Sequence, residues 1–150
     1  MESQAPGPGA RDIELATLIR TTVARLVKLM RRETGNESQL SLTERSTMGA
    51  LYPDVELAPS EIARMEKVTT QSMSQVINHL VELDYISRTP SGDDKRKTIL
   101  KLTAAGVTRV EASRKEKQEW LAQVLYQRAT AEEKAVLLKS MQILSKLINE

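Results

Sequence analysis

The 150-residue chain contains no cysteine and no phenylalanine, and only one histidine and one tryptophan. Without cysteine, disulfides, thiolate zinc sites and thiol-based redox sensing are excluded. His79 alone does not make a zinc site, because zinc needs two or three further ligands. We therefore expect neither a metal nor a cofactor. Because aromatic side chains are so few, we expect an aliphatic, helical core.

Long apolar runs are also missing. No stretch approaches the roughly 18 apolar residues of a membrane-spanning helix. The opening segment, MESQAPGPGARD, lacks the apolar region of a secretory signal. We expect a cytoplasmic protein in which residues 1–10 are disordered and residues 11–150 form a single domain.

Motifs of catalysis are absent from the sequence. No GxGxxG, Walker-type loop or nucleophile motif occurs. Asp93 and Asp94 make a poor catalytic pair, because carboxylates in an exposed turn are neither buried nor held apart across a cleft. The chain is therefore not expected to be an enzyme.

The small formal net charge of +2 is unevenly distributed. From residue 88 to residue 103 five cations stand against two acids, namely Arg88, Lys95, Arg96, Lys97 and Lys101 against Asp93 and Asp94. One interpretation is a solvated hairpin tip that protects an edge strand. The other is a cationic surface that contacts a polyanion.

Apolar spacing and capping residues predict six helices and one hairpin. The predicted helices run from Asp12 to Arg32, from an N-cap at Thr43 through Leu51, from Pro59 to Glu66, from Thr70 to about Leu83, from an N-cap at Thr103 to about Arg128, and onward from a capping box of Thr130 and Glu133. YISRTP (85–90) and RKTILKL (96–102) predict a two-stranded hairpin with its turn at 91–94. The expected fold class is mainly α with a small β-hairpin wing.

The predicted helix from Thr70 has two distinct faces. Its apolar side chains share one face: Met73, Val76, Ile77 and Leu80. The other face is uncharged but rich in hydrogen-bonding groups: Gln71, Ser74, Gln75 and Asn78. Such groups pair with base edges, Gln and Asn with adenine especially, although a merely solvated helix face has the same pattern.

A helix, a short turn, a second helix and a hairpin form the order of a winged helix-turn-helix. The recognition helix would be the one that begins at Thr70. The preceding helix is expected to support it through Ile62, Ala63 and Met65. In the wing, Lys95, Arg96 and Lys97 would follow a DNA backbone, with Arg96 a candidate for insertion into a narrow minor groove. The carboxylates of the turn could hold Arg88 or Arg96 by a bidentate pair.

These residues resemble the MarR family of bacterial transcriptional regulators. The resemblance covers Leu42 to Gly106 and lies in LT at 42–43, PSEIA at 59–63, VTTQSMSQVINHLVELDYISR at 68–88 and DDKRKTILKLTAAG at 93–106. The last block, an Asp-x-Arg wing followed by a strand and Leu-Thr-x-x-Gly, is the most specific.

The resemblance implies a repressor that binds a pseudo-palindromic operator as a homodimer and is released by a small aromatic or phenolic effector. It implies a DNA-binding lobe at about 41–103 and dimerisation helices at about 11–33 and 104–150. The DNA-contacting candidates are Thr70, Gln71, Ser72, Ser74, Gln75, Asn78, Arg88, Lys95, Arg96 and Lys97. Met48, Tyr52 and Trp120 are candidates for lining an effector cavity, with ordinary core packing as the alternative.

Two residues depart from the family pattern. Asp84 stands where the family usually has glycine, so either the helix ends in a less comfortable backbone geometry or the turn is different. His79 replaces an arginine or lysine and is expected to weaken one phosphate contact. A winged helix that binds another protein instead of DNA remains the alternative function.

Overall fold

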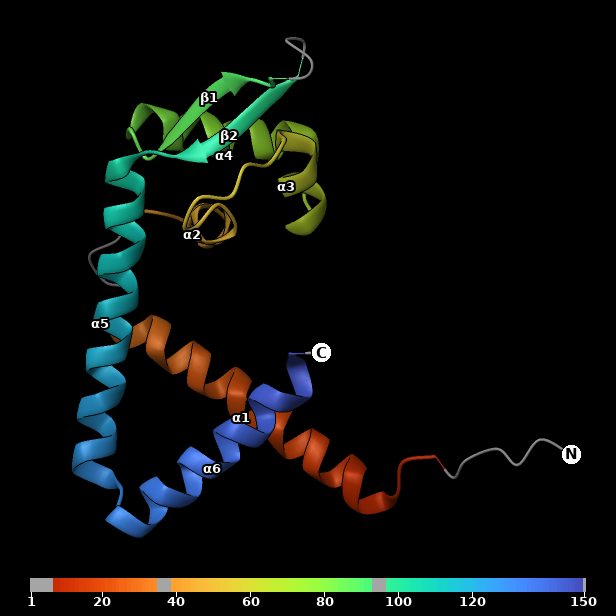
Figure 1. Cartoon of the computed structure of the whole chain (residues 1–150), viewed down its shortest axis with the longest axis vertical. Helices are drawn as coiled ribbons and strands as arrows, with labels where there is room; N and C mark the ends of the chain where they lie inside the picture. The colour runs from red at the N-terminus through yellow and green to blue at the C-terminus, as the bar shows by residue number, and fades with distance from the viewer. Residues whose placement is uncertain (1–6, 35–38, 93–96, 150) are drawn as a thin grey trace, which may run out of the picture. The chain divides into compact units, whose positions relative to one another are not determined.

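The computed structural model describes residues 7–34, 39–92 and 97–149. The chain forms two compact units, one from residues 37–119 and one from residues 1–36 together with 120–150. The described parts contain six helices and one antiparallel hairpin, arranged as in Figure 1, which confirms the expected fold class. None of the described helices is long and apolar enough to cross a membrane.

Three short helices open the unit of residues 37–119: α2 (Leu42–Ala50), α3 (Pro59–Met65) and α4 (Thr70–Glu82). Pro59 is the first residue of α3, where its missing N–H is not needed. The Thr69 hydroxyl caps α4 by accepting a hydrogen bond from the Ser72 N–H at 3.1 Å. The predictions for the start of α3 and α4 are thus confirmed.

The predicted N-cap of α2 was wrong. Ser41, not Thr43, precedes the helix, and its hydroxyl accepts from the Glu44 N–H at 3.2 Å. The Glu44 carboxylate accepts in return from the Ser41 N–H at 2.6 Å, which completes a capping box. The Ser-x-x-Glu spacing decides the start of this helix, because it satisfies two backbone donors at once.

The hairpin consists of β1 (Ile86–Pro90) and β2 (Thr98–Leu102), which pair antiparallel with Arg88 opposite Leu100. Leu57, in the extended segment before α3, pairs with Leu100 on the other edge of β2. Its N–H donates to the Leu100 carbonyl at 3.2 Å and its carbonyl accepts from the Leu100 N–H at 2.9 Å. This segment therefore covers an edge that would otherwise be open to pairing.

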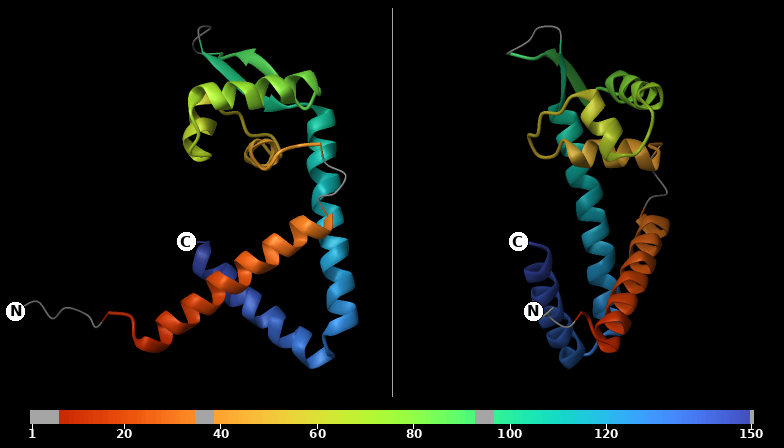
Figure 2. Two further views of the ribbon diagram at one scale, coloured as in Figure 1. Left: turned by 180° about the vertical axis from the view of Figure 1, so that it is seen from behind. Right: turned by 90° about the vertical axis from the view of Figure 1, so that its right-hand side faces the viewer.

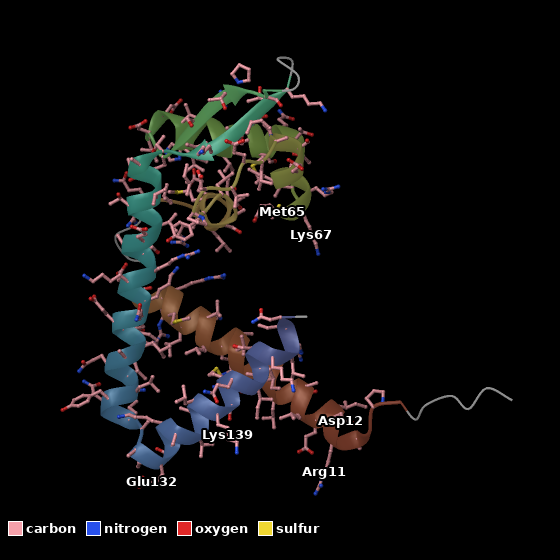
Figure 3. The ribbon with its side chains drawn as sticks, in the orientation of Figure 1. Arg11, Asp12, Met65, Lys67, Glu132 and Lys139 are labelled. Atoms are coloured by element: carbon pink, nitrogen blue, oxygen red, sulfur yellow. The ribbon has the colours of Figure 1, made fainter. Side chains whose placement is uncertain are left out.

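The core of this unit lies between α2, α3, α4 and the hairpin. It contains Leu40, Met48, Leu51, Ile62, Ala63, Met73, Ile77, Leu80, Ile86, Leu100 and Leu102. The apolar face predicted for α4 is thus buried, and Ile62 and Ala63 support it as expected. Met65 does not, because it is 55% exposed at the C-terminal end of α3, where Figure 3 labels it.

Asp84 follows the C-cap residue Leu83 of α4, and its backbone lies in the left-handed region with φ of 58°. The Tyr85 N–H reaches back to the Leu80 carbonyl at 2.9 Å, as in a glycine-terminated helix. Of the two expectations for Asp84, a less comfortable backbone geometry at the helix end or a different turn, the structure shows the first. The Thr103 hydroxyl donates to the Asp84 carbonyl and accepts from the Gly106 N–H at 3.0 Å, which stabilises the turn.

The hairpin leads into α5 (Ala104–Arg128), which Thr103 caps as predicted. Gly106 lies in its first turn, and a Cβ atom there would come within 2.0 Å of the Tyr85 carbonyl oxygen. The close approach of α5 to the turn after α4 therefore requires a glycine.

The unit of residues 1–36 and 120–150 contains α1 (Ala10–Thr34) and α6 (Ala131–Ile148), both visible from two further sides in Figure 2. The predicted capping box at the start of α6 is confirmed by the bonds between Thr130 and Glu133. Both helices expose large apolar side chains: Ile13, Leu15, Leu18, Val23 and Leu26 on α1, and Val136, Leu137, Leu138, Met141, Ile143, Leu147 and Ile148 on α6. Large apolar side chains exposed together on two helices indicate an interaction surface.

Candidate nucleic-acid interface

The outer face of α4 is open to solvent. Its four uncharged polar side chains are all exposed: Gln71, Ser74, Gln75 and Asn78. The Ser74 hydroxyl donates to the Thr70 carbonyl at 2.9 Å, so part of its capacity is used within the helix. Gln71 and Gln75 are one turn apart, and their side chains make no hydrogen bond within the described residues, which leaves their amides available to a ligand.

The first turn of α4 presents Thr70 and Ser72. Both side chains are exposed, and the Ser72 hydroxyl accepts a hydrogen bond from the Thr69 hydroxyl at 2.9 Å. This turn is therefore fixed by its own cap before any ligand arrives.

Arg88 on β1 connects the hairpin to α4. Its guanidinium donates a hydrogen bond to Oδ1 of Asn78, and both residues are exposed. The two candidates thus meet although ten residues separate them. The bond occupies an acceptor of Asn78, so in this arrangement Asn78 offers a ligand mainly its amide donor.

The cationic tip of the hairpin is only partly described. Lys97 is exposed, and its carbonyl accepts from the Ser91 N–H at 2.7 Å, which closes the base of the loop. The candidates Lys95 and Arg96, and the acids Asp93 and Asp94, lie outside the described residues.

Lys101 on β2 forms ion pairs with the loop that precedes α3. Its ammonium group contacts Asp54 at 2.7 Å and Glu56 at 3.6 Å. The hydrogen bond and charge of Asp54, aided by Glu56, hold the pKa of Lys101 above its ordinary value. Its charge is therefore balanced by the loop before α3 and adds little to a cationic wing.

His79, also on α4, faces α2. Its Nδ1 atom lies 2.5 Å from a carboxylate oxygen of Glu44, and the two residues are 35 positions apart. Burial raises the pKa of Glu44, but the hydrogen bonds from His79 and Ser41 outweigh this and hold it below its ordinary value. The expectation that His79 weakens one phosphate contact stays a prediction, and the structure adds a contact of His79 within the protein.

A pocket of about 240 Å³ lies between α2 and the first half of α5. Its lining residues are Leu40, Arg45, Met48, Gly49, Arg109, Val110, Ser113, Arg114 and Lys117. Four of these are cationic and none is acidic, while three are apolar. The combination suits a small ligand with an apolar body and a negative charge.

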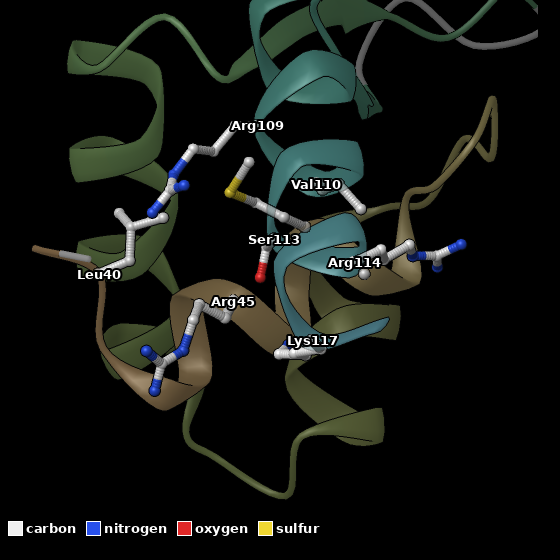
Figure 4. Close-up of a pocket in the computed structure, with 9 residues that line it drawn as sticks. Leu40, Arg45, Arg109, Val110, Ser113, Arg114 and Lys117 are labelled. Carbon is white, nitrogen blue, oxygen red and sulfur yellow. The ribbon is translucent and has the colours of Figure 1, made fainter. Parts of the chain in front are cut away.

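Figure 4 shows how the cations are arranged: Arg45 and Arg109 extend to one side of Ser113, and Arg114 extends to the other. The Arg114 guanidinium lies 3.9 Å from the ring centre of Tyr52, a cation–π contact that holds it in place. The Tyr52 hydroxyl donates to Glu111 at 3.3 Å.

The three effector candidates lie in different surroundings. Met48 lines this pocket and is also 2% exposed, so it belongs to the core as well. Tyr52 is outside the lining residues and acts on the pocket through Arg114. Trp120 belongs to the other unit, where it lines a separate pocket of about 290 Å³ with Leu29 and Val124.

Sequence reasoning missed the cations of the pocket and the Glu44–His79 pair. A signal existed for the pocket, because Arg109, Ser113 and Lys117 recur at four-residue steps on one face of a helix. No comparable signal existed for Glu44 and His79, because their contact depends on how α2 and α4 pack.

Comparison with known proteins gives a consistent result. Residues 38–97 match the sequence model of the MarR family. An HTH-type transcriptional regulator of Mycobacterium bovis is 31% identical over 114 residues, which cover 76% of this chain and 79% of that protein. Another from Mycobacterium leprae is 27% identical over 139 residues, covering 93% and 96%.

Solved structures share the fold. The transcriptional regulator Tm0710 of Thermotoga maritima superposes with a TM-score of 0.78 at 16% identity, over 91% of this chain and 95% of that one. Wild-type MarR from Escherichia coli, in its apo form, gives a TM-score of 0.68 at 21% identity, over 89% and 96%.

Proposed function

The chain belongs to the MarR family of transcriptional regulators, and we propose that it is a cytoplasmic repressor that binds a pseudo-palindromic operator as a homodimer. Members of this family regulate transcription and are not enzymes. The proposal rests above all on the exposed, uncharged polar face of α4.

The α4 face would read bases in the major groove. Gln71 and Gln75 carry free amides on one side of the helix, and an amide can pair with both hydrogen-bonding atoms of adenine. Thr70, Ser72, Ser74 and Asn78 would add contacts to bases and phosphates from the same surface. The buried face of α4 keeps this surface in place against the core.

The hairpin would contact the DNA backbone. Lys97 is exposed at its base, and Lys95 and Arg96, outside the described residues, supply further charge. Arg88 lies between hairpin and helix, bonded to Asn78. The cations of the hairpin would supply affinity through phosphate contacts, and the neutral polar groups of α4 would supply sequence specificity through base contacts.

The homodimer is inferred from the apolar side chains exposed on α1 and α6. Leu138, Leu147 and Ile148 are 63%, 67% and 78% exposed, although α6 is a regular helix of 18 residues. A second copy of the chain would bury them. The two DNA-binding lobes would then bind half-sites about one helical turn apart, and affinity rises because binding of the first lobe holds the second close to its half-site.

The effector is proposed to be a small aromatic or phenolic acid bound in the pocket between α2 and α5. Its carboxylate would meet Arg45 and Arg109, and its ring would meet Met48 and Val110. The effector would bind more tightly to a dimer arrangement in which the two DNA-binding lobes are wrongly spaced for the operator. Its binding would therefore favour that arrangement and release the DNA.

The central test is selection of bound fragments from random duplex DNA with the purified full chain. The expected product is a two-fold symmetric motif whose half-sites are about 10 base pairs apart between centres. Recovery of no motif, with retention of DNA that does not depend on salt, would reject a DNA-binding role and favour a protein-interaction module.

The effector is tested with benzoate as the probe and benzamide as its uncharged control. Benzoate should release the selected duplex from the wild-type protein, and benzamide should not. Arg109→Ala should require about tenfold more benzoate, because one charge-assisted contact is lost. Equal release by benzoate and benzamide would contradict a cationic pocket that selects an anionic ligand.

A further inference from the structure

The carboxylate of Glu44 is a rigid anchor beneath α4. Its side chain is only 9% exposed, and one of its oxygens is already held by the Ser41 N–H at 2.6 Å. The other oxygen faces the His79 imidazole at 2.5 Å. A buried carboxylate with one oxygen fixed in a helix cap has little freedom to follow a moving partner.

His79 lies at the border between the buried and exposed faces of α4. Its side chain is 44% exposed, and it directly follows Asn78 on the reading face. Asn78 is bonded to Arg88 of β1. Asn78 thus attaches α4 to β1, and the next residue, His79, attaches it to α2.

Other charged groups around α4 are engaged elsewhere or point to solvent. Arg88 is bonded to Asn78, and Glu66 at the end of α3 accepts from the Ser46 hydroxyl at 2.6 Å. Arg45 follows Glu44 but lines the pocket, and Glu82 on α4 is exposed. Within the described residues, Glu44 is therefore the charged group in contact with the imidazole.

We propose that His79 is a positioning residue for DNA reading: its protonated form clamps α4 to the anchored Glu44 carboxylate, and DNA affinity therefore falls as pH rises and the clamp loses its charge. The inference rests on the proposed function, because it concerns how the α4 face meets a duplex.

The chemistry of the pair gives the direction of the effect. A protonated imidazole forms an ion pair and a charge-assisted hydrogen bond with the carboxylate, whereas a neutral imidazole offers at most an ordinary hydrogen bond. The stronger contact limits rotation of α4 about its axis. Gln75 lies one turn before His79, so such rotation would move its amide away from a base edge.

The pH profile of DNA binding is the first test. Affinity of the full chain for a duplex selected from random DNA is measured from about pH 6 to pH 8 at constant ionic strength, the interval in which imidazoles change charge. The wild type is expected to lose about fivefold or more across it. His79 is the only histidine of the chain, and substitutions at this position show whether it causes the loss.

Two substitutions at His79 sharpen the test. His79→Lys keeps a cation opposite Glu44 throughout this interval and should bind with little pH dependence. His79→Gln keeps a neutral donor and should bind weakly at every pH. A flat wild-type profile, or a His79→Gln profile as steep as the wild type, would overturn the inference.

Glu44→Gln separates positioning from a direct contact between the imidazole and a phosphate. Glutamine also completes a capping box, so α2 keeps its cap while the anchor loses its charge. The pH dependence should disappear in this variant. If it persists undiminished, the imidazole acts on DNA directly and the positioning role is wrong.

A measurement on the wild type avoids any folding defect of the variants. The imidazole C–H resonance of the single histidine is followed by NMR with and without the selected duplex. Because coupling is reciprocal, DNA should move the titration midpoint to higher pH. An unmoved midpoint would refute the inference.

Failure of the two proposals can be told apart. If selection yields a symmetric motif but affinity is independent of pH, only the role of His79 is wrong. If no duplex is bound at any pH, the proposed function fails, and the inference that rests on it fails as well.

Discussion

Arg88 on β1 donates a hydrogen bond to Oδ1 of Asn78 on α4. This bond joins the wing to the reading helix across their exposed surfaces. It also makes the two residues a unit, since loss of either partner leaves the other without its contact. We expect them to act together in DNA binding.

The double-mutant cycle of Arg88→Ala and Asn78→Ala tests this unit. Because the residues share one bond, the two losses of binding free energy should not add, and the coupling should be about 0.5–3 kcal/mol. Fluorescence anisotropy with the selected duplex measures it. Gln71→Ala with Arg88→Ala serves as the control pair and should be additive; additivity in both pairs would show that the bond plays no part.

Lys97 and Gln75 should affect DNA binding in different ways. Lys97→Ala should reduce the slope of log affinity against log salt by about 1, because one phosphate contact is lost. Gln75→Ala should leave that slope unchanged and cost about 1–3 kcal/mol at the preferred base pair. Titrations at several salt concentrations measure both effects, and a salt-dependent effect of Gln75→Ala would mean that it contacts phosphate.

Gly106→Ala should destabilise the protein. The new Cβ would meet the Tyr85 carbonyl oxygen at 2.0 Å, so α5 or the turn after α4 must shift, at a cost of about 1–3 kcal/mol that exceeds the helix propensity gain of about 1 kcal/mol. Urea denaturation measures the change.

Gly49→Ala is the matched control in α2, where a Cβ would meet no atom within 4 Å. It should stabilise by up to about 1 kcal/mol. Equal effects of the two substitutions would contradict the close approach at Gly106.

Glu44 should stabilise the fold at neutral pH and lose this effect in acid. Its folded pKa lies below the ordinary value of 4.5, so its contribution is complete above that pH and is lost as pH falls through the folded pKa. Glu44→Gln should therefore cost about 1 kcal/mol at neutral pH and progressively less in acid.

Chemical denaturation at several pH values follows this difference. Glu82→Gln, which removes an exposed carboxylate of α4, is the control for the loss of one negative charge. A penalty for Glu44→Gln that stays constant from neutral pH into acid would contradict a role for the ionised carboxylate.

Leu138→Glu should dissociate the proposed homodimer. Leu138 is 63% exposed on α6, and a charge placed in an apolar interface is strongly unfavourable. Lys139→Glu changes the adjacent exposed residue and is the control. Analytical ultracentrifugation gives the mass of each; a wild-type protein that is already monomeric would disprove the dimer.

Much of the fold was predictable because its signals are local. The start of α3 at Pro59, the caps of α4 and α6, and the alternation of the hairpin each depend on residues within a few positions of one another. The same holds for the amphipathic α4. Thr43 failed as a cap because Ser41 offered a better local pattern with Glu44.

The candidate site was only partly predictable. The reading face of α4 follows from helical periodicity, and the structure exposes all four of its polar side chains. The surroundings of Lys101 and Met65 do not follow from periodicity, because they depend on the loop before α3 and on where the core ends. The supporting role expected for Met65 was wrong for that reason.

The sequence by itself determined the family, the order of helices and hairpin, and the character of the α4 surface, since each is written in short-range spacing. Only the tertiary structure decided which distant residues meet: Glu44 with His79, Asn78 with Arg88, and the cations that gather around the pocket. The physical reason is that such contacts depend on the packing of whole elements, and a difference of about one residue in helix register turns a side chain by about 100°.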